Sequence, residues 1–339
     1  METLWFCLIA VMIAMYVVLD GFDLGAGIVH LWVARTDGER RQVLRSIGPV
    51  WDGNEVWLLA GGGTLFFAFP ALYAASFSGF YLPLMVVLWL LSARACAVEF
   101  RNHLNTPTWT PLWDLVFAAS GALLAVFFGA ALGNVVRGVP LDAKGEFFLS
   151  LWTNFGVHGE VGILDWYTIL VGVLAYLTLM MHGALWVAHK TEGALAARAA
   201  RTARWGWYGV AALTVLATLA TFQIQPQVPA NFAAHPWGYV FPALALLGLV
   251  GVKVRTAFLA SCLYIVGMLT SAAFGVFPYV LPSNTDAHLG LTIYNAATGH
   301  YGLVVGLGWF VPGMLLATAY TVFVYRQFAG KVKPEVAGY

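Results

Sequence analysis

The sequence predicts an all-α integral membrane protein of about nine transmembrane helices, arranged as two four-helix bundles plus one extra helix. Hydrophobic residues make up 60% of the 339 residues and charged residues 10%, whereas soluble domains contain roughly 45–50% and 25%. Apolar runs of about 20 residues, long enough to cross a bilayer as a helix, recur along the whole chain. Basic residues gather in alternate loops between these runs, which is typical of multi-pass proteins.

Nine apolar runs define the predicted spans. The first, Thr3–Ala34, is longer than a signal-peptide core and has no basic segment before it, so we expect it to be retained. The seventh, Tyr239–Val252, is the shortest. The other seven are Pro49–Phe69, Leu72–Val98, Leu112–Val136, Tyr167–Ala188, Gly206–Phe222, Phe258–Val280 and Tyr301–Tyr325.

The distribution of charge predicts the orientation of the chain. All of the 17 basic residues except Arg137 and Lys144 fall on one side of the predicted spans. Since lysine and arginine stay on the cytoplasmic side of short loops, we expect the N-terminus outside and the C-terminus in the cytoplasm. A break after the fourth run predicts an N-terminal bundle (1–136), an outside loop (137–166) and a C-terminal bundle (167–339).

Two acidic pairs lie within predicted spans, Asp20 with Asp23 in the first and Asp52 with Glu55 in the second. The i, i+3 spacing places both carboxylates of a pair on one helix face. An acidic side chain at the bilayer centre costs about 2.5–3.5 kcal/mol on insertion scales. We therefore expect these acids to serve a polar pathway, to bind a partner group or to be protonated.

Glycines surround the first acidic pair. Gly21 and Gly25 form a small-xxx-small face on which a second helix can approach closely. Two interpretations of Asp20 and Asp23 stay open from the residues alone: hydrogen bonds across a tight helix crossing, or the handling of ions or protons.

The second acidic pair lies in the opening turns of its predicted helix. Negative charge is favoured there by the helix dipole, so capping competes with a functional interpretation. A cap needs one acid, however, and Asp52, Asn54 and Glu55 are concentrated between Trp51 and Trp57. This concentration favours a site of proton uptake or the edge of a cofactor site.

A third group of titratable residues lies on the predicted cytoplasmic side. Glu99 and His103 are four residues apart, on one helix face, and Asp114 begins the fourth span. Together with Asp52 they predict a titratable route into the bilayer, because histidine exchanges protons near neutral pH. Ordinary solvated charges at the membrane surface are the alternative.

The histidines do not predict a haem site. A haem within the membrane needs axial ligands on facing helices, and of the eight histidines only His182 lies deep in a predicted span. The sequence contains no HExxH, CxxC, phosphate-binding glycine loop or nucleophile elbow, and nothing in it indicates a nucleic-acid partner. We expect a chain that binds no metal or cofactor and is not catalytic alone, but completes the site of a partner and supplies its protons.

The segments Leu19–Gly25 (LDGFDLG) and Ser46–Trp57 (SIGPVWDGNEVW) resemble the second subunit of cytochrome bd-type quinol oxidases, a family that includes a cyanide-insensitive branch. The order and spacing of these motifs hold across the whole chain. The resemblance continues through Gly61–Gly63, Phe66–Pro70, Tyr73–Ala75, Ser78–Tyr81, Glu99–Arg101 and Phe277–Ser283.

The resemblance implies a complex of the bacterial cytoplasmic membrane that oxidises quinol on the outer side and reduces dioxygen to water with cytoplasmic protons. Its three haems, two of b type and one of d type or a b-type replacement, are expected on subunit I, the partner in a heterodimer. Small single-helix subunits and a bound lipid or quinone are compatible with this expectation.

The resemblance also implies roles for individual residues. Asp52 is similar to the carboxylate at the inner end of the family's proton route, with Glu99, His103 and Asp114 leading to it. Trp57 is similar to the residue at the mouth of an apolar oxygen channel. Better-known members carry aspartate and lysine in place of Glu99 and His103, so the histidine step departs from the family pattern.

Asp20, Asp23 and Trp51 match the polar cluster of the family, in which their roles are structural or proton-linked. Glu55 belongs to the same cluster, where some relatives carry glutamine. Two rival functions stay open: a purely structural scaffold, and a secondary transporter, for which matching broken helices in the two halves are typical. The second half has no counterpart to the acidic pairs.

Overall fold

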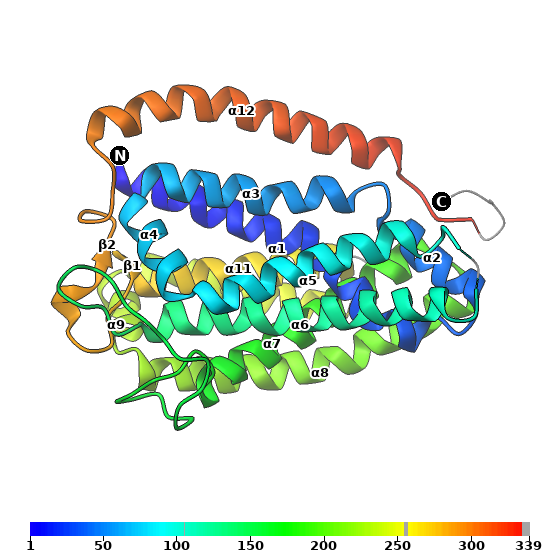
Figure 1. Cartoon of the computed structure of the whole chain (residues 1–339), viewed down its shortest axis with the longest axis horizontal. Helices are drawn as coiled ribbons and strands as arrows, with labels where there is room; N and C mark the ends of the chain where they lie inside the picture. The colour runs from blue at the N-terminus through cyan, green and yellow to red at the C-terminus, as the bar shows by residue number, and fades with distance from the viewer. Residues whose placement is uncertain (105, 254–256, 334–339) are drawn as a thin grey trace.

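A computed structural model of the chain describes residues 1–104, 106–253 and 257–333. The long helices lie roughly side by side in one elongated bundle, with α12 along one side and α8 toward the other (Figure 1). The α-helices are α1 (Glu2–Val33), α2 (Asp37–Ile47), α3 (Trp51–Ala68), α4 (Pro70–Gly79), α5 (Tyr81–Phe100), α6 (Trp109–Arg137), α7 (Trp166–Lys190), α8 (Gly193–Ile224), α9 (Gln227–Ala234), α10 (Val240–Gly251), α11 (Ala257–Val276) and α12 (His300–Gln327).

The helices confirm the predicted fold class. In the described part of the chain, seven of them (α1, α5, α6, α7, α8, α11 and α12) are long and apolar enough to cross a membrane. Two bent helix pairs can each form one further span: the chain bends by 119° between α3 and α4, and by 108° between α9 and the helical segment Pro236–Gly251. The protein is therefore an all-α, multi-pass membrane protein with up to nine spans.

The predicted span Leu72–Val98 is wrong as a single helix, because α4 ends and α5 begins on either side of Phe80. Prolines explain both breaks in this region. Pro70 disfavours helical conformation in the residue before it, and Phe69 has φ −130° and ψ 66° between α3 and α4. Pro83 lies in the first turn of α5, where its missing N–H is tolerated.

Two other predicted spans have different bounds in the structure. The run Phe258–Val280 is interrupted, because α11 ends at Val276 and is followed by the antiparallel strands β1 (Tyr279–Leu281) and β2 (Leu291–Thr292). The run Gly206–Phe222 is only part of α8, which begins at Gly193. The first turns of α8 carry the basic residues that were expected in a loop.

Helix α1 lies at the centre of the bundle, in contact with α3, α6, α7 and α11. Its closest approach is to α7, where a Cβ added to Gly25 would lie 1.9 Å from the carbonyl oxygen of Leu179 and 2.7 Å from the amide nitrogen of Gly183. This confirms the close approach that the small residues of the first span predict. The crossing holds the acidic segment of α1 at a fixed depth in the bundle.

The segment between α6 and α7 contains a buried ion pair. The Arg137 guanidinium donates to the Asp165 carboxylate and to the carbonyl oxygen of Gly162. Asp165 also caps α7 by accepting hydrogen bonds from the amides of Tyr167 and Thr168. These contacts join both ends of the segment to the ends of α6 and α7.

Candidate functional site

A buried arginine joins two of the predicted acids. Arg94 of α5 donates from Nη1 to Asp20 Oδ1 at 2.5 Å and from Nη2 to Glu55 Oε2 at 2.8 Å. Asp20 and Arg94 are buried, whereas the Glu55 side chain is 23% exposed. The ring of Trp51 lies 5.9 Å from the guanidinium carbon of Arg94. Arg94 of α5 thus links α1 and α3, and its two carboxylate partners extend from the partly exposed Glu55 to the buried Asp20.

Asp23 is held by an amide. Asn54 of α3 donates from Nδ2 to Asp23 Oδ2 at 2.7 Å and to the carbonyl oxygen of Leu19 at 3.2 Å. Tyr325 of α12 donates its hydroxyl to Asn54 Oδ1 at 2.9 Å. Asp20 and Asp23 therefore face two different polar partners in the same buried region, which α1, α3, α5 and α12 enclose.

We define the inner cluster by its six residues: Tyr16, Asp20, Asp23, Asn54, Glu55 and Arg94. Among the described residues, four of its buried atoms have no hydrogen-bond partner: the Tyr16 hydroxyl, Asp20 Oδ2, Asp23 Oδ1 and Arg94 Nε. Buried polar groups are normally paired with protein or with ordered water. The cluster also contains three carboxyl groups but only one cation. Its carboxyl groups can therefore bind protons as well as make hydrogen bonds within the cluster.

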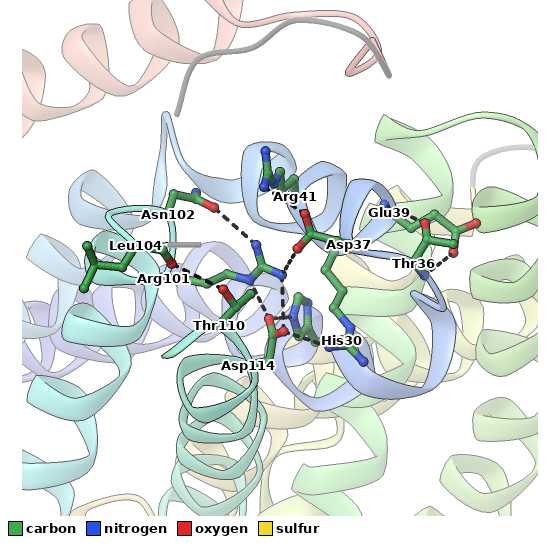
Figure 2. Close-up of polar contacts among 11 residues, drawn as sticks. His30, Thr36, Asp37, Glu39, Arg41, Arg101, Asn102, Leu104, Thr110 and Asp114 are labelled. Carbon is green, nitrogen blue, oxygen red and sulfur yellow. Dashed lines mark hydrogen bonds and ion pairs between the residues drawn. The ribbon is translucent and has the colours of Figure 1, made fainter. Parts of the chain in front are cut away.

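Asp114 belongs to a separate cluster near the start of α6 (Figure 2). Its buried carboxylate lies 2.6 Å from His30 Nε2, 2.6 Å from Arg101 Nε and 2.9 Å from Arg40 Nη1. Arg101 also donates from Nη2 to Asp37 Oδ1 at 2.7 Å. Because a histidine and two arginines surround Asp114, this acid is tied to α1, α2 and the end of α5.

The other predicted route residues lie at the surface. Asp52, Glu99 and His103 are exposed, and His103 Nδ1 contacts the backbone oxygen of Glu99 at 2.9 Å rather than its carboxylate. Within the described residues, no hydrogen bond or ion pair joins these three side chains to Asp114. The structure thus brings Asp20, Asp23, Glu55 and Trp51 together, whereas no described hydrogen bond or ion pair joins Asp52, the Glu99–His103 pair and Asp114 to one another.

Trp57 is buried against Tyr16 and Leu19, beside the inner cluster. An apolar cleft of about 310 Å³ opens next to it between α3 and α12. The cleft is lined by residues that include Gly53, Val56, Trp57, Met314, Ala317 and Tyr320. The cleft reaches from the surface of the chain to the indole of Trp57, and no charged side chain among the described residues lines it.

Arg94 was expected among the basic residues on the cytoplasmic side of the predicted spans. It lies inside α5 and is buried. Apolar residues on both sides of Arg94 in the sequence were a signal for this position. Asn54 stood out in the sequence beside Asp52 and Glu55, but its partners on α1 come from a distant part of the chain. Tyr16 gave no signal, because a single tyrosine is ordinary in an apolar run.

His182, the histidine that lies deep in a span, does not fit haem ligation in this structure. His182 Nδ1 lies 2.7 Å from Ser261 Oγ, and His182 Nε2 lies 2.9 Å from the carbonyl oxygen of Val18. An axial ligand needs a free ring nitrogen facing the iron, and neither ring nitrogen of His182 is free. His30 Nε2 lies 2.6 Å from Asp114 Oδ1, while His30 Nδ1 has no hydrogen-bond partner among the described residues.

Comparisons with known proteins agree along the whole chain. The family model described as "Cytochrome bd terminal oxidase subunit II" matches residues 1–328. The "Probable cytochrome oxidase subunit 2" of Haemophilus influenzae is 32% identical over 97% of this chain and 94% of its own length. The "Cytochrome bd-I ubiquinol oxidase subunit 2" of Escherichia coli K12 is 30% identical over 98% and 95%.

A solved structure shares the fold. A chain of the bd oxidase from Geobacillus thermodenitrificans superimposes with a TM-score of 0.76 at 17% sequence identity. The match covers 96% of this chain and 98% of that chain.

Proposed function

Because the chain belongs to the cytochrome bd terminal oxidase subunit II family, we propose that it supports a haem-bearing subunit I in quinol oxidation coupled to the reduction of dioxygen to water. A subunit of this kind is part of a quinol oxidase complex and thus of an oxidoreductase. The proposal adds that this chain contributes proton uptake from the cytoplasm and oxygen access. Aerobic electron transport through the complex would then generate proton-motive force.

The observation that carries the proposal is the inner cluster next to an exposed acid. Asp52 lies three residues before Glu55 at the start of α3, and Glu55 accepts a hydrogen bond from the buried Arg94, which also donates to Asp20. Reduction of dioxygen to water takes up one proton for each electron. A chain of carboxyl groups and water between the surface and the membrane interior suits that need, since protons move between hydrogen-bonded groups.

In the proposed route, Glu99 and His103 collect protons at the cytoplasmic surface and Asp52 passes them to the partner. His103 suits the first step because one ring nitrogen of an imidazole can accept a proton while the other donates one. Asp114 belongs to the same end of the molecule, where it fixes His30 and Arg101. Asp20, Asp23, Trp51 and Glu55 serve as structural or proton-linked supports.

Oxygen access is assigned to the apolar cleft beside Trp57. Dioxygen is apolar and concentrates in the hydrocarbon of the bilayer, so a route from the membrane needs apolar walls. The cleft between α3 and α12 offers such walls next to a buried tryptophan.

The proposal places all haems on subunit I, two of b type and one of d type or its b-type replacement, since both ring nitrogens of the deep histidine His182 are engaged within this chain. Subunit I would cover the exposed face of α3 and α12, where Asp52 lies. Only 6% of the residues in the most apolar stretch of α12 are buried within this chain. Small single-helix subunits, lipid or quinone would occupy other apolar faces.

A secondary transporter is the alternative that the broken helices suggest. Both halves contain a bent pair, α3 with α4 and α9 with α10. However, α9 and α10 carry no acidic residue, and the family assignment supports the oxidase. The proposed orientation keeps the N-terminus outside and the C-terminus in the cytoplasm of a bacterial inner membrane.

The haem assignment is tested by reduced-minus-oxidised optical spectra of the gently purified complex and of this chain purified alone. We expect haem bands only when the large partner subunit is present. Haem bands from this chain alone would contradict the assignment of the haems to subunit I. A preparation with neither haem nor a large partner would contradict the proposed complex.

A further inference from the structure

The segment between α6 and α7 presents an aromatic surface that the proposed function does not use. We define the aromatic loop as residues 148–155, whose large apolar side chains, Phe148, Leu151, Trp152 and Phe155, are between 39% and 78% exposed. The neighbouring Phe147 is buried in the core. Several large apolar side chains that are exposed close together indicate an interaction surface.

Backbone contacts hold the aromatic loop in place. The amides of Ile163 and Leu164 donate to the carbonyl oxygens of Ser150 and Leu151 at 2.9 and 3.0 Å. The rings of Trp152 and Phe155 lie 5.1 Å apart. Phe155 has a φ of 64°, a left-handed conformation that is unusual for a bulky residue. The loop is therefore built to hold these rings outward.

The position of the loop indicates the depth at which it lies. Trp166 is the first residue of α7, a candidate membrane span, and its amide donates to the carbonyl oxygen of Phe155 at 3.3 Å. The ends of spans lie at the boundary between hydrocarbon and headgroups, where tryptophan and other amphipathic aromatic side chains are enriched. The aromatic loop is thus level with the membrane boundary.

The composition of the loop points to the same environment. Residues 147–157 contain no charged side chain, whereas the preceding turn contains Asp142, Lys144 and Glu146. Hydrogen bonds from the Lys144 and Glu146 amides to Asp142 Oδ1 hold that turn together, and they lower the pKa of Asp142. A charged, water-facing turn is followed directly by an uncharged aromatic one.

We propose that the aromatic loop is a membrane anchor that binds phospholipid in the interfacial region of the leaflet at this end of the bundle. A protein partner is the other conceivable occupant of the surface. The partner subunit is proposed to cover α3 and α12, whereas the segment between α6 and α7 lies at the end of the bundle at which α7 begins (Figure 1). Lipid is the environment that surrounds the remaining sides of a multi-pass protein.

Site-specific photocrosslinking in cells tests this inference. The substitution Phe148→p-benzoylphenylalanine puts the probe on the most exposed side chain of the loop, and Lys144→p-benzoylphenylalanine in the charged turn is the matched control. After illumination, the complex is purified and this chain is analysed by mass spectrometry. We expect the Phe148 probe to give a phospholipid adduct in several times the yield of the Lys144 probe.

Two outcomes would overturn the inference. A crosslink from position 148 to another protein would show that a protein covers the loop. A phospholipid yield at position 148 that is low and no higher than that at position 144 would show that the loop lies in water. If the variant at position 148 fails to accumulate, Trp152→p-benzoylphenylalanine provides the same comparison on the neighbouring ring.

Discussion

Arg94 links the buried Asp20 of α1 to the partly exposed Glu55 of α3. Its two Nη atoms reach Asp20 and Glu55, and the inner cluster as defined contains no second cation. Removing one partner of a buried ion pair leaves a charge without compensation, which typically costs about 3–5 kcal/mol. The stability of the cluster should therefore be far more sensitive to Arg94 than to the surface arginines.

We predict that Arg94→Gln lowers the apparent midpoint of thermal unfolding of the solubilised complex and reduces the amount assembled. Arg94→Lys should recover only part of the loss, because a single ammonium group does not reproduce the two-pronged geometry of guanidinium. Unfolding followed by intrinsic fluorescence measures the shift.

Arg198→Gln is the matched control for Arg94. Arg198 donates to Glu39 at 2.5 Å, but the two side chains are 18% and 21% exposed. Pairs near the surface contribute only about 0–1 kcal/mol. An equal loss of stability in Arg198→Gln and Arg94→Gln would contradict the central place of Arg94 in the fold.

Helix α1 depends on glycine where it crosses α7. A Cβ on Gly183 would lie 2.1 Å from the carbonyl carbon of Gly25, so an alanine there forces the two backbones apart. We predict that Gly183→Ala lowers the yield of assembled complex and loses haem with it. Quantitative blotting together with haem content measures both effects.

Gly38→Ala provides the comparison for the helix crossing. Gly38 lies in α2, and a Cβ added there has no heavy atom within 4 Å. Alanine is favoured over glycine in a helix by roughly 0.5–1 kcal/mol, so this variant should assemble normally. Normal assembly of Gly183→Ala as well would show that the crossing tolerates separation.

Helix α2 depends on Glu39, which completes a capping box with Thr36 and accepts a hydrogen bond from Arg198. Burial raises the pKa of Glu39, but the hydrogen bonds from Arg198 and the Arg35 amide outweigh it and hold the pKa below its ordinary value of 4.5. A carboxyl group with a lowered folded-state pKa stabilises the fold above its unfolded pKa.

We therefore predict that Glu39→Gln lowers the thermal midpoint at pH 7 and that the difference from the unchanged protein shrinks below pH 4.5. The stabilisation is lost as the pH falls through the folded pKa of Glu39. Thermal unfolding across a pH series measures this difference. A difference that is constant with pH would mean that the carboxylate charge of Glu39 contributes nothing to stability.

At the scale of the whole molecule, the number and type of the spans were predictable because hydrophobicity and alternating charge act over long windows. The break at Phe69 agrees with the predicted end of the second span. The break at Phe80 was missed, since helices continue through many prolines in membranes and only packing decides where a chain turns. The bonds of Arg94 and Asn54 within the cluster were missed because their partners are far away in sequence, and Tyr16 was missed because nothing in the sequence distinguishes it. The acidic pairs themselves were visible, because carboxylates are rare in apolar runs.

The predicted division into residues 1–136, 137–166 and 167–339 stays a prediction. Helix α1 belongs to the first part by sequence, yet it packs closely on α7 of the third part through Gly25 and Gly183. We propose that the two bundles share α1 as a common element. The inner cluster then lies close to this junction, and its carboxyl groups face helices that the partner subunit is proposed to contact.

The most direct test of the account measures proton uptake during oxygen reduction by the complex that carries Asp52→Asn. Glu192→Gln is the control, because Glu192 is an exposed acid whose only described ion pair is a 3.5 Å contact with Lys331. We expect Asp52→Asn to keep its haem content and to slow both oxygen consumption and proton uptake several-fold, while Glu192→Gln keeps the normal rates. Unchanged rates in a fully haem-loaded Asp52→Asn complex would contradict proton uptake through this subunit.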